Sequence, residues 1–93
     1  MTDITLASIV VQKPNQVSTN LGQEIVILGL GSEQYYSLKE VGAQIWTLLA
    51  APTSVQKILD ALLKQYTVEA ARCQADLLVV LQDLAAEGLI EVQ

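Results

Sequence analysis

Residues 24–38 read EIVILGLGSEQYYSL, and this stretch contains the strongest strand signals of the chain. The segment from Glu24 to Leu28 is an almost unbroken apolar run, which favours a strand with both faces at least partly covered. Residues 29–32 are typical of a hairpin loop, and residues 34–38 follow as a strand that contains two tyrosines. The stretch therefore predicts an antiparallel hairpin.

The residues before this hairpin predict a further strand. Residues 9–12 are β-prone, and residues 13–16 form a turn in which Pro14 suits the second position. Residues 17–19 resume the strand. We therefore expect one three-stranded antiparallel sheet, which needs another layer to bury its apolar face.

The second half of the chain predicts that layer as three helices. Ser37 with Glu40 has the capping-box pattern and opens a first helix over residues 38–50, which Pro52 prevents from continuing. Thr53 with Gln56 repeats the pattern and opens a second, amphipathic helix that runs to residue 66.

The third helix is expected to run from a cap at Thr67 to Glu87, where Gly88 stops it, and residues 89–92 form a short β-like tail. Four of its charged residues share one narrow strip: Arg72, Asp76, Asp83 and Glu87. A first apolar stripe contains Cys73, Leu77, Val80, Leu81 and Leu84. A second stripe contains Ala71, Ala75, Leu78, Val79, Gln82 and Ala86. Either both stripes belong to the core, or the second forms the floor of a binding groove.

Together these elements predict an α+β protein in which a three-stranded antiparallel sheet is followed by three helices. This is a winged helix-turn-helix arrangement. With 93 residues and no internal linker, the chain is expected to be a single domain over residues 1–93.

The composition excludes several classes of function. Apolar residues make up 52% of the chain, which is too many for a disordered protein. There is no His, so the chain lacks His-based catalysis and His-ligated metals, and its one Cys allows no intrachain disulfide and no Cys-rich zinc site. We expect no metal or cofactor. It shows no transmembrane run and no signal peptide, so we expect a cytoplasmic protein that does not bind membranes.

Nucleic acid is not an expected partner either. Five Lys and Arg residues stand against ten Asp and Glu residues, for a net charge of −5. Binding to phosphates depends on Lys and Arg. In a winged helix the third helix would lie in the major groove, yet here Arg72 is its one cation.

The sequence contains no catalytic constellation. Asp76 and Asp83 share a helix face, about 10 Å apart, but a solvated polar strip explains them. Cys73 falls on the apolar stripe, as a buried and inert thiol does. We therefore expect a protein that is not an enzyme.

Peptide or protein binding remains. An exposed edge of the strand at residues 34–38 would accept an added peptide strand beside the third helix. Tyr36 and Leu38 would face one side of the sheet, and Tyr35 and Ser37 the other. The tyrosines either pack across strands or line the groove. The same edge would also suit self-pairing in a homodimer.

The sequence resembles the PqqD-like family over residues 9–92. The resemblance is carried by residues 35–49 (YYSLKEVGAQIWTLL), 54–58, 66–68, 76–77 and 81–90 (LQDLAAEGLI). It implies a recognition element for the precursors of ribosomally synthesised, modified peptides. Such a domain binds the leader segment by strand addition between the third strand and the third helix.

The resemblance further implies that the precursor is presented to separate modifying enzymes. The Tyr-Tyr-Ser-Leu motif favours the lasso-peptide branch, whose leader-binding protein works with a leader protease and a cyclase. The alternative branch presents its peptide to a radical SAM enzyme in pyrroloquinoline quinone synthesis.

The peptide-binding residues implied by the resemblance lie on the strand and on the third helix. They are Gln34, Tyr35, Tyr36, Ser37, Ala71, Arg72, Ala75, Asp76, Leu78, Val79 and Gln82. Arg72 and Asp76 would hold polar groups of the leader at the rim. Val79→Asp is expected to weaken leader binding most, because a charge would lose its water in the groove.

Overall fold

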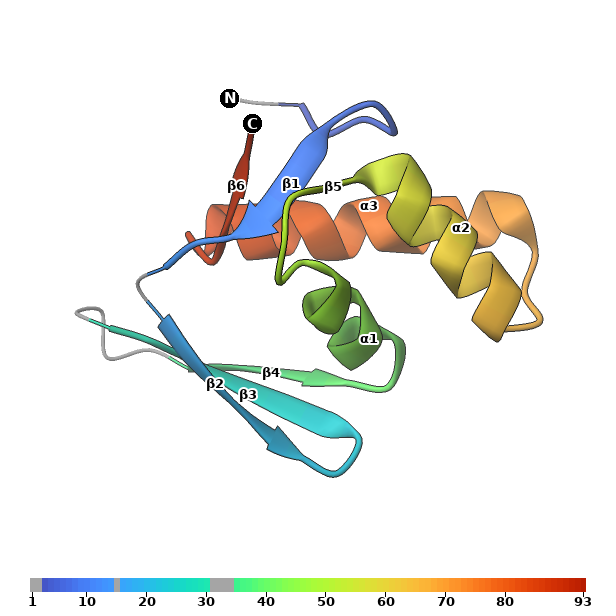
Figure 1. Ribbon diagram of the computed structural model, residues 1–93. Coiled ribbons are helices and arrows are strands. Elements are labelled where there is room, and N and C mark those ends of the chain that lie inside the picture. Colours follow the sequence, from blue (N-terminus) through green and yellow to red (C-terminus); the bar gives the residue numbers. More distant parts are fainter. Residues whose placement is uncertain (1–2, 15, 31–34) are drawn as a thin grey trace.

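The computed structural model describes residues 3–14, 16–30 and 35–93 as an α+β fold with two small antiparallel sheets and three helices (Figure 1). The strands are β1 (Ile9–Gln12), β2 (Gln16–Leu21), β3 (Glu24–Gly29), β4 (Tyr35–Lys39), β5 (Thr53–Ser54) and β6 (Ile90–Val92). The helices are α1 (Val41–Leu48), α2 (Val55–Gln65) and α3 (Ala70–Ala86).

The hairpin predicted from residues 24–38 belongs to the sheet β2-β3-β4. β2 and β3 are joined by a two-residue turn between Leu21 and Glu24, in which Gly22 has a φ of 69°. Ile25 and Ile27 of β3 are buried, whereas Leu28 is exposed. The sheet therefore covers one of its faces and leaves the other open. Gln34 and the loop residues 31–32 lie outside the described residues.

The expected sheet is wrong in one respect. Residues 9–12 do not extend β2 but form β1, which pairs with β5 and β6 in the order β5-β1-β6. Val10 lies opposite Val92, so the two ends of the chain meet in this sheet. The pairing explains the short β-like tail, which needed a partner from the other end of the chain.

The helix caps also differ from those expected. Ser37 lies within β4, where its hydroxyl donates to Glu24 Oε2 at 2.6 Å, so it cannot cap α1. The position before α1 is Glu40, whose side chain makes no cap bond. The first helix accordingly covers residues 41–48 rather than 38–50.

At α2 the cap is Ser54, whose Oγ accepts a hydrogen bond from the Lys57 N–H at 3.2 Å, and not Thr53. At α3 the position is taken by Glu69, without a side-chain bond, and not by Thr67. The expected stop at Gly88 is confirmed, with a φ of 73°.

The core lies between α3, the other two helices and both sheets. The first stripe of α3 contributes Cys73, Leu77, Leu81 and Leu84, all buried, and Val80, which is half-buried. The second stripe is exposed except for Leu78, which is half-buried. The alternative in which both stripes belong to the core is therefore wrong.

Candidate functional site

β4 forms one edge of its sheet, with β3 as its neighbour among the described strands. The Glu40 N–H donates to the Gln23 carbonyl at 3.1 Å, so these two opposite residues form a hydrogen-bonded pair. Hydrogen-bonded pairs recur at every second residue of an antiparallel ladder. Residues 36 and 38 therefore direct their backbone groups toward β3. The N–H and C=O groups of Tyr35, Ser37 and Lys39 point to the free edge, where an added strand could pair with them.

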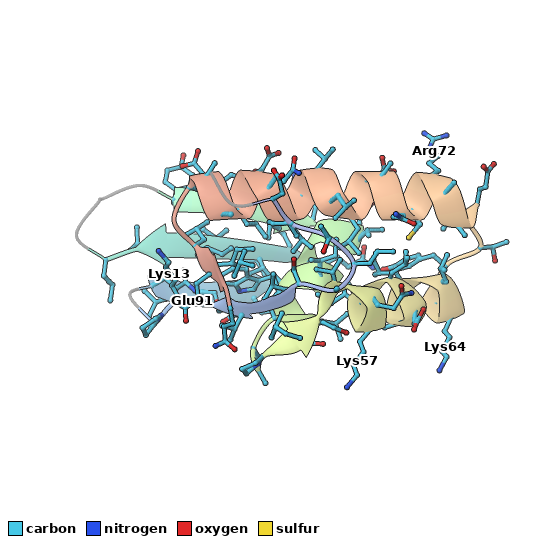
Figure 2. All side chains as sticks on the ribbon, turned by 90° about the horizontal axis from the view of Figure 1, so that it is seen from above. Lys13, Lys57, Lys64, Arg72 and Glu91 are labelled. Atoms are coloured by element: carbon cyan, nitrogen blue, oxygen red, sulfur yellow. The ribbon has the colours of Figure 1, made fainter. Side chains whose placement is uncertain are left out.

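α3 runs along the same side of the molecule as this edge. In Figure 2 the arrow of β4 emerges from beneath α3, and in Figure 1 β4 lies below α3 with α1 between them. The two elements run in opposite directions, so the end of β4 and the start of α1 lie toward the first half of α3.

A cavity of about 230 Å³ opens where these elements meet. It lies at the junction of β4 with α1, between the end of α2 and the first half of α3. The lining residues are Val41, Gly42, Ile45, Leu62, Tyr66, Val68, Arg72, Cys73, Asp76, Leu77 and Val80. Most of these side chains are apolar, so the cavity suits an apolar anchor beside the free edge of β4.

Gly42 shapes the wall of this cavity that is nearest to β4. A Cβ at this position would lie 3.3 Å from Leu38 Cδ2. Gly42 therefore lets α1 begin close to the end of β4. Two residues earlier, Glu40 has a φ of 52° and a ψ of −115°, which reverses the chain sharply between β4 and α1.

An ion pair on α3 forms the polar rim. Arg72 Nε lies 4.0 Å from Asp76 Oδ2, and both side chains are largely exposed. Figure 2 shows Arg72 projecting from the first part of α3. Below the rim, desolvation by burial and then the charge of Asp76 raise the pKa of the Cys73 thiol above its ordinary value. The raised pKa favours the neutral thiol, which contributes an apolar group to the cavity wall.

The structure places the expected strand residues on the two faces of β4. Tyr36 packs against the core opposite Ile27, whereas Tyr35 is 76% exposed and lies opposite Leu28. Ser37 is exposed on the same face as Tyr35. None of these side chains lines the cavity, so the contribution of β4 to a site is its backbone edge.

Of the expected helix residues, Arg72 and Asp76 line the cavity. Ala71, Ala75 and Val79 are exposed and do not line it, and neither does half-buried Leu78. Gln82 lines a different cavity, next to β6. At about 100° per residue, Leu78 lies about 160° around the helix from Asp76. The first stripe of α3 therefore faces the core and the cavity, whereas the second stripe faces away from the cavity.

Sequence reasoning missed the lining residues that lie outside α3, namely Val41, Gly42, Ile45, Leu62, Tyr66 and Val68. The sequence pattern marks none of them as a site residue. Their shared position depends on the packing of three helices, and no local pattern signals it.

Other kinds of site find no support in the described parts of the chain. Within residues 3–14, 16–30 and 35–93, no group of three His, Cys, Asp or Glu side chains could hold a metal ion. No helix described for this chain combines the length and the apolar character needed to cross a membrane.

Comparison with known proteins identifies a family model and two similar folds. The family model described as Coenzyme PQQ synthesis protein D (PqqD) matches residues 24–90. The structure of TbiB1 in complex with the TbiA(beta) leader peptide is 32% identical, with a TM-score of 0.82, and the match covers 87% of this chain and 94% of that one.

A lasso peptide synthetase B1 complexed with the leader peptide is 21% identical, with a TM-score of 0.78. The match covers 88% of this chain and 96% of that chain, and it shows the same fold. No curated protein sequence matches this chain.

Proposed function

Because this chain belongs to the PqqD family, we propose that it binds the leader segment of a ribosomally synthesised, lasso-type precursor peptide. The observation that carries the proposal is the free edge of β4 beside an apolar cavity on α3. The similarity to TbiB1, which was solved with a leader peptide, supports it.

Binding would proceed by strand addition. The backbone groups of Tyr35, Ser37 and Lys39 would pair with the leader and provide affinity with little dependence on its sequence. Tyr35 and Ser37, on the open face of the sheet, would flank the side chains that the leader presents to solvent.

Selectivity would come from the cavity at the end of β4. An apolar leader side chain would bury itself against Val68, Val80 and Leu77. Arg72 and Asp76 would bind polar groups of the leader at the rim. The other expected helix residues, Ala71, Ala75, Leu78, Val79 and Gln82, form an alternative wall that the experiment below tests.

We further propose that the chain has no catalytic activity of its own and delivers the bound precursor to a leader protease and a cyclase. The arrangement of three helices beside a three-stranded antiparallel sheet supports the winged helix-turn-helix class. Figure 2 shows Lys57 and Lys64 projecting from one side of the molecule, Arg72 from the opposite side and Lys13 toward the other end. These cations form no single basic surface, which argues against a nucleic-acid partner.

A second candidate function follows from the description of the family, which is coenzyme PQQ synthesis. In that case the chain would present its precursor to a radical SAM enzyme. The same edge and cavity would serve, and the peptide that binds would distinguish the two pathways.

The strand-addition step is tested by Ser37→Pro, with Ser37→Ala as its matched control. Both variants remove the hydroxyl that bonds Glu24, but the proline also removes an N–H that points away from β3. The peptides encoded by short reading frames beside the gene are labelled, and their binding is measured by fluorescence polarisation at protein concentrations of about 1 µM. We expect Ser37→Pro to weaken binding about tenfold or more and Ser37→Ala to leave it nearly unchanged.

The wall of the groove is tested by Val68→Asp and Val79→Asp. Both valines are about half exposed, at 50% and 57%, so both variants should fold, and circular dichroism verifies this. Val68 lines the cavity, so its variant should lose about tenfold in affinity. If Val79→Asp loses affinity instead, the outward stripe of α3 is the binding wall. If no encoded peptide binds the wild-type protein, the leader-binding function is refuted.

A further inference from the structure

β2 forms the second edge of the sheet, opposite β4. Five of its six residues are exposed, and Gln16 is half-buried. The strand contains no charged residue and no proline, although exposed edge strands usually contain one or the other, which blocks pairing with another chain. In a chain with a net charge of −5, this edge is conspicuously neutral.

The backbone of β2 is arranged for pairing at this edge. Leu21 and Glu24 flank the two-residue turn, so they form a hydrogen-bonded pair, and alternate residues repeat this pattern along the strand. Thr19 and Val17 therefore direct their backbone groups toward β3. Ser18 and Asn20 direct theirs to the free edge.

The side chains of β2 make the edge self-complementary. Val17 and Leu21 are 53% and 56% exposed, four residues apart, on the open face of the sheet. Thr19 lies midway between them on the same face. A strand with this pattern matches its own reverse.

We propose that β2 pairs antiparallel with β2 of a second copy of this chain, about a two-fold axis through Thr19. Val17 then lies opposite Leu21 of the second copy, and Leu21 lies opposite Val17 of the second copy. Ser18 and Asn20 exchange backbone hydrogen bonds with their counterparts. Val17 and Leu21 fall in the non-hydrogen-bonded pairs, whose side chains lie closest together.

Other registers fit less well. A shift of one residue opposes backbone groups that point away from each other. A shift of two residues leaves both Val17 and Leu21 without an aliphatic partner. The register centred on Thr19 is the one that satisfies both the backbone and the exposed aliphatic side chains.

The interface is small, which determines how strong it should be. Six residues along one edge bury much less than the ~1,600 Å² of a standard interface, so we expect a weak dimer that forms reversibly at about 100 µM or above. β2 lies on the far side of its sheet from β4 and α3 (Figure 2), so the β4 edge stays free in the dimer. This inference does not depend on the proposed leader binding.

The test is sedimentation velocity of the full chain over a concentration series from about 10 µM to 1 mM. The wild-type protein should shift from monomer toward dimer. Thr19→Lys places two like charges opposite each other on the axis, so it should remove the shift. Thr19→Glu should do the same, and an equimolar mixture of the two variants should dimerise again because the opposed charges then attract.

Two proline variants separate the edges. Ser18→Pro removes an N–H that points to the free edge of β2 and should abolish dimerisation, whereas Ser37→Pro on β4 should leave it intact. A wild-type protein that stays monomeric at 1 mM overturns the proposal. So does association that persists in Thr19→Lys, or that Ser37→Pro removes. Leader binding, measured at about 1 µM where the dimer is dissociated, is scored independently.

Discussion

Single residues create the junction on which the candidate site depends. Glu40 has a φ of 52° and a ψ of −115°, a backbone conformation that side chains other than glycine adopt at a cost of about 1–3 kcal/mol. The Glu40 N–H bonds the Gln23 carbonyl, and its own carbonyl accepts from Gln44, so the structure on both sides holds it in place. These two bonds hold the strained conformation and thereby set the angle between β4 and α1. Residues of α1 line the cavity.

Glu40→Gly should relieve this strain. We expect the free energy of unfolding to rise by about 1 kcal/mol, because glycine reaches this conformation without a Cβ clash. Urea denaturation provides the measurement. Glu69→Gly is the control, since Glu69 has an ordinary φ of −69° and makes no cap bond, and it should not stabilise the protein. A Glu40→Gly protein no more stable than Glu69→Gly would contradict the prediction.

Cys73 reports on the cavity through its raised pKa. Burial and the Asp76 carboxylate both disfavour the thiolate, so at a fixed pH near 8 the thiol should react with iodoacetamide more slowly than free cysteine. Asp76→Asn removes the second cause and lowers the pKa. The thiolate fraction and the alkylation rate, followed by mass spectrometry, should therefore rise. Asp83→Asn, further along the helix, should leave the rate unchanged, and an equal rise in both variants would count against the prediction.

At the scale of elements, periodicity located the helices better than capping patterns did. The stripe of α2 predicted a helix that does run from Val55 to Gln65. The capping boxes, by contrast, misplaced the start of each of the first two helices. A Ser or Thr caps a helix only where the chain turns out of an extended conformation, and strand pairing by β4 and β5 decides that position.

The cap of α2 can be tested directly. Ser54→Ala removes the oxygen that accepts from the Lys57 N–H, so the free energy of unfolding should fall by about 1 kcal/mol. Thr53→Ala should have a smaller effect, because Thr53 makes no bond to the helix N-terminus. Thermal denaturation of both variants distinguishes them, and a larger loss in Thr53→Ala would restore the cap expected from the sequence.

At the scale of the whole molecule, both sheets share one core. Val10 of β1, Ile27 of β3 and Ile90 of β6 are each no more than 2% exposed, and all belong to the same buried cluster. Neither sheet has a core of its own. The fold is therefore expected to be lost in a single cooperative step.

Urea unfolding should accordingly follow one transition by two probes. Fluorescence of Trp46, the sole tryptophan, reports on the buried side of α1, and far-UV circular dichroism reports on all helices. The midpoints should coincide, and Leu84→Ala should lower both equally, with a loss of about 2–5 kcal/mol. Separate midpoints would show that the sheet β2-β3-β4 unfolds on its own.

The sequence by itself determined the order and type of most elements, the buried stripe of α3, the alternation of Tyr35 and Tyr36 on their strand, and the family. These features arise from residues close together in the chain, whose spacing reflects the period of a helix or a strand. Tertiary structure decided the rest. Val10 meets Val92 across almost the whole chain, and the cavity joins residues of three helices. Which sheet a strand joins, which edge stays open and which flank of α3 borders the cavity depend on such distant contacts, and no local period encodes them.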